Sequence, residues 1–172
     1  MSADRGIQNP RRPDRLFNTS LEYGLRMLFL LDAANPEIAD LQRLISYDYL
    51  LIHSGDVEGG PQSLHPAVPF RGSELLVKRD VVRSGLDLMF ARELIDKRVT
   101  ARGIVYGGSE MTRAFLELLK VTYAAELRKR AQWVIERFGS LSDDELNSFM
   151  SSNIGRWGAE FEHLTALRDL EL

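Results

Sequence analysis

The side chains that could hold a metal ion or move a proton are few in this sequence, and they are scattered. Three histidines, His53, His65 and His163, fall on separate predicted elements and have no metal-ligand spacing. The chain contains no cysteine, which excludes a thiol nucleophile, a cysteine-based zinc site and a disulfide framework. We therefore predict no metal site and no cofactor, and we interpret the histidines as hydrogen-bonded or exposed side chains.

Two short motifs have chemical alternatives that their neighbours disfavour. Asp143-Asp144-Glu145 could form a carboxylate cluster, but Ser142 and Glu145 have the spacing of a capping box, and the helix dipole favours acidic residues in a first turn. Gly107-Gly108-Ser109 could form a phosphate loop, but it lacks the lysine of a P-loop and the flanks of a nucleophile elbow. These patterns predict that the chain is not an enzyme.

One catalytic alternative stays open at this stage. Metal nucleases can assemble carboxylates from distant segments, and the sequence does not place Asp48, Asp56 and Asp80 relative to one another. Asp56 directly follows Gly55, however, where an aspartate also serves as a turn or capping residue.

Positive charge gathers in one segment of the chain and negative charge in another. Residues 71–102 contain eight basic and five acidic side chains, whereas residues 140–172 contain two basic and seven acidic ones. Lys78, Arg79 and Arg83 could contact DNA phosphates from one predicted helix, although acidic neighbours at helical spacing are typical of a solvated face. We predict that any DNA binding through these three residues is weak, non-specific and salt-sensitive.

The length of 172 residues and the net charge of −3 fit one domain with appendages. Residues 1–15 are polar, lack the apolar centre of a signal peptide, and are predicted to form a flexible arm. The longest apolar run, residues 27–31, is far shorter than the ~20 residues that a membrane span needs. We expect a cytoplasmic protein with no membrane partner and no small-molecule substrate.

Apolar periodicity and capping signals predict a mainly α fold. Thr19-x-x-Glu22 opens a strongly apolar first helix, which should be central to a core or to an interface, and Asn35 with Pro36 is predicted to cap and begin a second helix over residues 36–52. The pattern then predicts a proline-rich loop over residues 56–73 and a third helix over residues 73–95. Two short strands follow at residues 97–101 and 104–106. A fourth helical segment over residues 109–138, continuous or broken near Thr122, precedes a short helix that Ser142 opens and that starts at residue 143.

A β-hairpin that follows three helices is typical of a winged helix, which combines a three-helix core with a short hairpin wing. We therefore predict a winged-helix-like domain over residues 16–139 and a C-terminal helix and tail over residues 140–172. The loop at residues 56–73 is long for a compact domain, which often marks a partner-binding segment, and its apolar residues suggest that it packs on another surface, which we expect to belong to a partner chain. Its three prolines pre-extend it, which lowers the ordering cost of binding a partner.

An arginine and a tryptophan stand out in the polar tail. Arg156-Trp157-Gly158, with Phe161 after it, could anchor the tail on its own domain. The same residues could instead be an anchor for another chain, because tryptophan and arginine dominate the energetics of protein interfaces.

Four groups of residues make the chain similar to a known family. They are Leu16-Phe17-Asn18-x-x-Leu21-Glu22-Tyr23-Gly24-Leu25-Arg26, Asp48-Tyr49-x4-Ser54-Gly55-Asp56, Ser63-Leu64-His65-Pro66-Ala67-x-Pro69-x-Arg71 and Gly155-Arg156-Trp157-Gly158-x-Glu160-Phe161. With these residues the chain resembles the small middle component of bacterial ABC-three-component defence systems, including the small subunit of Lamassu-type complexes. The similarity covers residues 16–161.

The resemblance implies a non-catalytic, winged-helix adaptor that bridges an SMC- or Rad50-like ATPase dimer and a separate effector, often a nuclease, in a DNA-sensing antiphage or anti-plasmid machine. It carries over no catalytic residues, so the motif positions would be structural or subunit contacts. The residues expected to bind partners are Leu64, His65, Pro66, Pro69, Phe70, Arg71, Arg156, Trp157 and Phe161. The alternative is a free-standing winged-helix transcription regulator that binds DNA as a dimer. The acidic residues interleaved in the third helix and the apolar excess of the first favour the adaptor.

Overall fold

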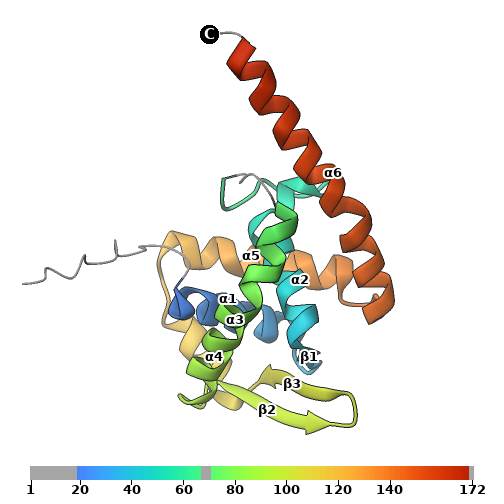
Figure 1. Ribbon diagram of the computed structural model, residues 1–172. Helices are drawn as coiled ribbons and strands as arrows, with labels where there is room; N and C mark the ends of the chain where they lie inside the picture. Colours follow the sequence, from blue (N-terminus) through green and yellow to red (C-terminus); the bar gives the residue numbers. More distant parts are fainter. Residues whose placement is uncertain (1–18, 67–70, 171–172) are drawn as a thin grey trace, which may run out of the picture.

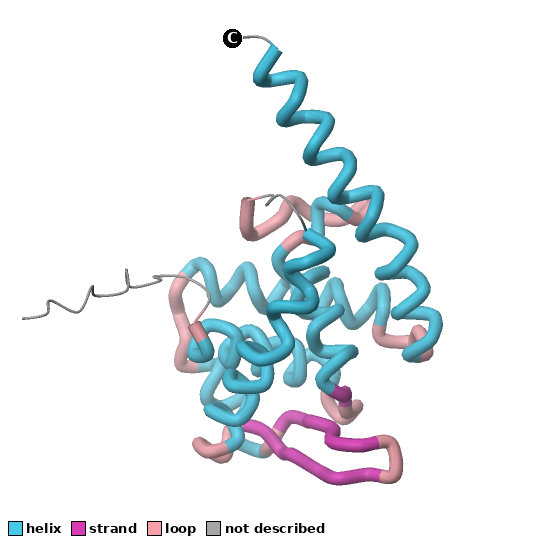
Figure 2. The backbone as a smooth tube through the Cα atoms, viewed as in Figure 1, coloured by secondary structure: helices cyan, strands magenta, loops and turns pink. Residues whose placement is uncertain are grey.

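The computed structural model describes residues 19–66 and 71–170, with the backbone alone at residues 71–77 and 158–170. Helices dominate, as the sequence predicts, and a small antiparallel sheet lies at one end of the helical body (Figures 1 and 2). The predicted arm, residues 1–15, lies outside the described part of the chain. The elements are α1 (Ser20–Ala34), β1 (Ala39–Asp40), α2 (Leu41–Ile52), the 3-10 turn η1 (Ser54–Asp56), α3 (Arg71–Phe90), β2 (Ile95–Thr100), β3 (Gly103–Gly108), α4 (Glu110–Glu117), α5 (Thr122–Phe138) and α6 (Asp143–Leu170).

α1 is the central helix of the body. Its N-terminus is capped as predicted, because the backbone N–H of Glu22 donates to Thr19 Oγ1 at 3.3 Å. Side chains all around its C-terminal half are buried, since α2, α3 and α5 pack against it. Of the two places that the sequence allows for this apolar helix, a core or an interface, the structure shows a core.

α1 and α3 cross at two glycines. A Cβ atom at Gly85 would lie 2.7 Å from the backbone nitrogen of Gly24 and 2.8 Å from the carbonyl oxygen of Ser20. A Cβ atom at Gly24 would in turn lie 2.8 Å from the carbonyl oxygen of Gly85. These contacts are to backbone atoms, so no flexible side chain can move aside, and both positions require glycine. The close crossing sets the path of α3 relative to the polar residues of α1.

The start of α2 differs from the prediction. The helix begins at Leu41 and is capped by Asp40, whose Oδ1 accepts a hydrogen bond from the backbone N–H of Arg43 at 2.8 Å. The prediction that Asn35 caps this helix and Pro36 begins it is therefore wrong. The two residues before α2 form β1 instead, because pairing with β3 holds them extended.

The sheet has the strand order β1-β3-β2, so β2 is an edge strand. β2 and β3 pair along their whole length, which confirms the predicted hairpin and lengthens both of its strands. α3 ends at Phe90, earlier than predicted, because the chain turns at Glu93 (φ 60°) and enters β2. Gly103, at φ 110°, closes the hairpin turn in a conformation that residues with a Cβ atom avoid.

The predicted fourth helical segment is broken into α4 and α5 by residues 118–121. The capping box at Ser142 is confirmed, since the N–H of Glu145 donates to Ser142 Oγ at 3.2 Å and the N–H of Ser142 donates to Glu145 Oε2 at 2.7 Å. The helix that follows is not short, because α6 continues to Leu170 and its second half projects from the body (Figure 1). Among the described residues, no helix combines the length and the apolar character that crossing a membrane requires.

Candidate functional site

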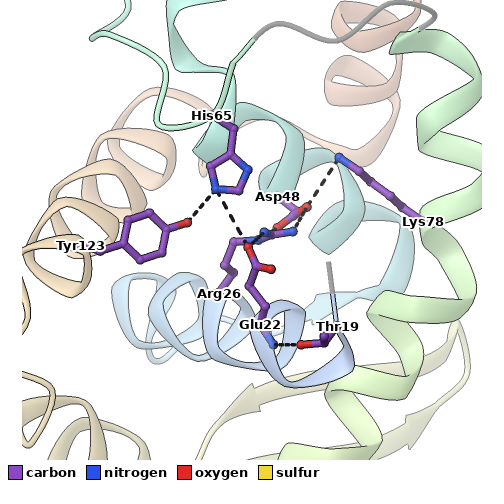
Figure 3. Close-up of polar contacts among 7 residues, drawn as sticks. All are labelled: Thr19, Glu22, Arg26, Asp48, His65, Lys78 and Tyr123. Atoms are coloured by element: carbon purple, nitrogen blue, oxygen red, sulfur yellow. Dashed lines mark hydrogen bonds and ion pairs between the residues drawn. The ribbon is translucent and has the colours of Figure 1, made fainter. Parts of the chain in front are cut away.

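A buried ion pair joins α1 to α2. The Arg26 guanidinium donates from Nε to Asp48 Oδ1 at 2.6 Å and from Nη2 to Asp48 Oδ2 at 3.1 Å (Figure 3). Its Nη1 donates to Glu22 Oε1 at 2.9 Å, one helical turn earlier in α1. Arg26 and Asp48 have no exposed surface. This two-point contact fixes the two helices relative to each other.

The surroundings of Arg26 keep its side chain charged although it is buried. Burial alone disfavours the cation, but the charge of Asp48 and its hydrogen bonds outweigh burial and raise the pKa of Arg26. The guanidinium carbon also lies 4.1 Å from the centroid of the Tyr23 ring, a cation–π contact. A buried charge is stable only beside its counter-charge, so the pair holds α1 and α2 in one relative position.

α3 adds a second cation to this group. Lys78 Nζ lies 4.0 Å from Asp48 Oδ2 and 6.0 Å from the centroid of the Tyr49 ring, and the side chain is almost fully buried. Asp48 therefore faces one cation from α1 and one from α3. This placement corrects the expectation that Lys78 contacts DNA, because a buried ammonium group cannot reach a phosphate. Arg79 and Arg83 do lie on the exposed face of α3.

His65 connects the loop before α3 to the same group. Its Nε2 lies 2.8 Å from the Tyr123 hydroxyl on α5 and 4.0 Å from Glu22 Oε1 (Figure 3). Burial, and after it the positive charge of Arg26, lower the pKa of His65, so its imidazole is neutral near pH 7. Burial also raises the pKa of Tyr123. We call the following residues the polar network: Glu22, Arg26, Asp48, His65, Lys78 and Tyr123.

The loop before α3 runs along α5 in the opposite direction. Arg137 donates to the carbonyl oxygen of Glu58 at 2.9 Å. Arg130 donates from Nε and Nη2 to the carbonyl oxygen of Gln62, at 3.1 and 2.7 Å. The hydroxyl contact of His65 follows next along the loop. The described part of this loop therefore packs on its own domain, and its expected contact with a partner chain stays a prediction.

A stack of aromatic rings anchors α6 to α2. The ring centroids of Trp157 and Tyr49 are 5.2 Å apart with an interplanar angle of 12°, and Trp157 is only 2 % exposed. The Tyr49 hydroxyl donates to Asp56 Oδ2 at 2.7 Å, which ties the turn after α2 to the same stack. Trp157 is thus an anchor on its own chain. The expectation that Trp157 contacts a partner is therefore corrected, because a buried ring offers no contact surface.

The other residues expected to bind partners differ in their exposure. Leu64 is half-buried against the core, whereas Pro66 and Arg156 are exposed. Four more lie outside the description, either entirely or in their side chains: Pro69, Phe70, Arg71 and Phe161. Apart from Trp157, the partner-binding role of this set stays a prediction.

Apolar side chains are exposed beside the polar network. Leu21 is next to Glu22 at the start of α1, and Leu118 and Val121 lie in the turn that leads to Tyr123. Leu118 and Val121 are 74 % and 66 % exposed. We call Leu21, Leu118, Val121 and Tyr123 the apolar corner.

The carboxylates that left a nuclease alternative open do not gather. Asp48 is held by Arg26 and Asp56 by Tyr49, while Asp80 is exposed on α3. Among the side chains that the structure describes, no three histidine or acidic groups are placed to hold one metal ion. What the polar network does is hold α1, α2, α3, α5 and the loop together around one set of paired charges.

Sequence patterns mark several members of the polar network, but they do not show which residues pair with each other. Glu22 and Arg26 stand four residues apart in an apolar helix, and Asp48 stands between two tyrosines in the next one. A charge in the apolar face of a helix needs a partner once it is buried, so these positions were the available signal. Tyr123 carried no such signal, because a tyrosine at the start of a helix is equally common at the surface.

Each of the four groups that carry the family resemblance contributes a residue to these contacts. Arg26 of the first group pairs with Asp48 of the second, His65 of the third lies beside Glu22, and Trp157 of the fourth stacks on Tyr49.

Residues 16–160 match the family model of the ABC-three component (ABC-3C) system Middle Component 2. No match was found among curated proteins or among solved structures. The family model covers most of the chain, and the chain therefore belongs to the middle component 2 family of ABC-three-component systems.

Proposed function

We propose that the chain is a non-catalytic adaptor that bridges an SMC- or Rad50-like ATPase and an effector subunit, often a nuclease, as in Lamassu-type antiphage complexes. Membership of a three-component family supports the presence of protein partners. The observation that carries the proposal is the apolar corner, where Leu118 and Val121 are exposed within a single turn between α4 and α5. Exposed apolar side chains that lie close together are typical of a site that another chain covers.

The position of the apolar corner also supports this role. Its members come from the start of α1, from the turn before α5 and from α5 itself, and His65 contacts both Tyr123 of α5 and Glu22 of α1. A surface that is already held in place loses little conformational entropy when a partner binds. The polar network would thus serve the adaptor by keeping its docking surface rigid.

The element order supports a winged-helix interpretation of the body. α1, β1, α2 and α3 precede the hairpin, and β1 joins it as the third strand. In such a domain α3 and the hairpin would face DNA. Arg79 and Arg83 are exposed there, but Asp80 and Asp87 stand between and beside them. We therefore expect any DNA contact of the chain to be weak, non-specific and salt-sensitive.

Co-expression with the ATPase and the third component of its system tests the adaptor role. We expect the three chains to co-purify, and we expect the double change Leu118→Asp and Val121→Asp to abolish co-purification, because two carboxylates would have to be buried in the interface. Leu64→Asp is a poorer test, because Leu64 packs against the core and its loss would also weaken the fold.

Met111→Asp is the matched control, because Met111 is also apolar and more than half exposed but lies at the start of α4, outside the apolar corner. It should leave the complex intact. If the unchanged chain stays a free monomer beside both components, the adaptor proposal fails. Protection of one discrete palindromic DNA site by the chain alone would favour the regulator alternative.

A further inference from the structure

The β2–β3 hairpin presents an open strand edge. In the order β1-β3-β2, β2 has a neighbour on one side only. No other described element makes a hydrogen bond to the backbone of this six-residue strand. The hairpin projects from the helical body, with β2 on its outer side (Figures 1 and 2). Unpaired backbone groups along an edge strand are a template on which a further strand can form.

One face of this edge is apolar. Val99, in β2, is 85 % exposed, and its cross-strand partner Ile104 is 45 % exposed. Lys97 and Tyr106 form the next pair but one on the strand and share this face, because alternate side chains of a strand point the same way. Phe90, at the end of α3, borders the face, with its ring centroid 5.8 Å from Lys97 Nζ. A strand added to β2 would cover Val99 from the open side, whereas Tyr106 is already buried.

The charge of the hairpin indicates the chemistry of such a strand. Residues 95–108 carry three basic side chains, Lys97, Arg98 and Arg102, and one acidic side chain, Asp96. Arg98 points to the face opposite Val99, and its only described ion pair, to Asp96, is long at 3.4 Å. The excess positive charge favours an acidic segment, with its acidic side chains on the Arg98 face.

A nucleic acid fits this edge less well than a peptide. Asp96 pairs with Arg98 and Asp87 pairs with Lys97, so the hairpin carries too little net positive charge for a continuous phosphate backbone. Val99 and Ile104 would also gain little from a polar phosphate surface, whereas an apolar side chain of a peptide would cover them. Backbone groups of β2 can pair with a polypeptide in a regular ladder, which a nucleic acid cannot form.

We propose that β2 receives an extended segment of a partner protein as an additional strand. The segment alternates apolar residues, which face Val99, with acidic residues, which face Arg98. The inference rests on the proposed adaptor function, because the segment belongs to the ATPase or to the third component. This site is separate from the apolar corner, so one chain offers two docking surfaces, as a bridge requires.

Overlapping 15-residue peptides that tile both partner chains, probed with the full chain, test the inference. We expect the bound peptides to alternate apolar and acidic residues. Binding should fall at least tenfold with Arg98→Glu, which reverses the charge, and with Val99→Asp, which breaks the apolar face. Met111→Asp, outside the hairpin, should bind as the unchanged chain does. The inference is overturned if no peptide binds, or if binding is insensitive to Arg98→Glu.

Hydrogen exchange of the assembled complex gives a second readout. Amides of residues 95–100 should exchange at least tenfold more slowly in the complex than in the free chain. A complex that assembles without this protection overturns the strand addition and leaves the adaptor function standing, whereas failure to assemble counts against the adaptor function itself. Protection by duplex DNA alone, or by a dimer of the chain that Val99→Asp dissociates, would show a different occupant and would also overturn the inference.

Discussion

The polar network and the β2–β3 hairpin distribute charged and apolar side chains in opposite ways. In the network Arg26 and Asp48 are entirely buried, whereas on the hairpin Val99 is almost entirely exposed and Arg98 faces solvent. Buried charge and exposed apolar surface are both unfavourable on their own. In the network, contacts within the chain offset the cost of burying charge, because each charge has a counter-charge. The hairpin has no such offset, since among the described residues nothing covers Val99.

The difference separates the residues that build this fold from those that are free to contact another molecule. Residues of the groups that carry the family resemblance, among them Arg26, Asp48 and Trp157, make their contacts within the chain. The exposed apolar residues of the hairpin and of the apolar corner lie, except for Leu21, outside those four groups. In this chain the motif residues Arg26, Asp48 and Trp157 thus hold the scaffold together, and surfaces for partners are identified from exposure.

Breaking the network should have the largest effect on stability. Asp48→Ala leaves Arg26 and Lys78 buried without their shared carboxylate, so the free energy of unfolding should fall by about 3–5 kcal/mol. Urea unfolding followed by circular dichroism measures the change. Asp48→Asn should cost a comparable amount, because it keeps the shape of the side chain and removes only the charge.

Asp80→Ala is the matched control, since Asp80 is an aspartate on the exposed face of α3. Its effect should stay within about 0.5 kcal/mol. A cost for Asp48→Ala that is as small as the cost for Asp80→Ala would show that the network is not what holds the helices together.

The second prediction concerns pH and has an intermediate effect. Folding lowers the pKa of His65 below its unfolded value, because the side chain is buried and, after burial, because Arg26 carries a positive charge nearby; Lys78 acts in the same direction, whereas Glu22 and Asp48 act against it. The unfolded chain therefore binds a proton at His65 that the folded chain does not. The stability that the neutral imidazole contributes is fully present above the unfolded pKa of about 6.5, and it is lost as the pH falls through the folded pKa.

His65→Gln removes this titration and keeps a polar side chain beside Tyr123. Stability of the unchanged chain should fall more steeply below pH 6.5 than stability of the variant, by at most about 1.4 kcal/mol per pH unit for one proton. Chemical unfolding at a series of pH values between 7.5 and 5 measures both curves. Parallel curves would mean that His65 titrates in the folded chain as it does in the unfolded one.

The sequence predicted most of the fold because its signals are local. The N-cap at Thr19, the capping box at Ser142 and the hairpin all follow from residues a few positions apart, whereas the break near Thr122 was one of two alternatives that the sequence left open. The start of α2 was mispredicted because Asn35 and Pro36 form a good local helix start, while the actual start depends on β1 pairing with a strand far along the chain. Long-range pairing overrides local preference at such a position.

The candidate site was less predictable, for the same physical reason. Lys78 lies in a run of basic residues that is typical of an exposed helix face. Only the approach of Asp48 from α2 explains its burial. Trp157 had two alternatives that composition cannot separate, because the same ring can anchor its own chain or another one. Exposure of Leu118 and Val99 depends on which side of each element the body covers, and this is set by the whole fold.

The smallest effect on stability is expected on the hairpin, and it sharpens the comparison with the network. Val99→Asp should lower the free energy of unfolding by no more than about 1 kcal/mol, because the side chain is exposed and only its strand preference is lost. Val105→Asp, in the facing strand, is the matched control, since Val105 is buried and a carboxylate there loses its water even though its cross-strand partner is Arg98; it should cost clearly more than Val99→Asp. Thermal and urea unfolding of the two variants measure the difference. If Val99→Asp proved as costly as Val105→Asp, Val99 would be part of the folded core in solution, and the hairpin edge would not be free for a partner strand. A small cost, combined with loss of partner binding, would instead show that Val99 is kept at the surface for a contact outside its own chain.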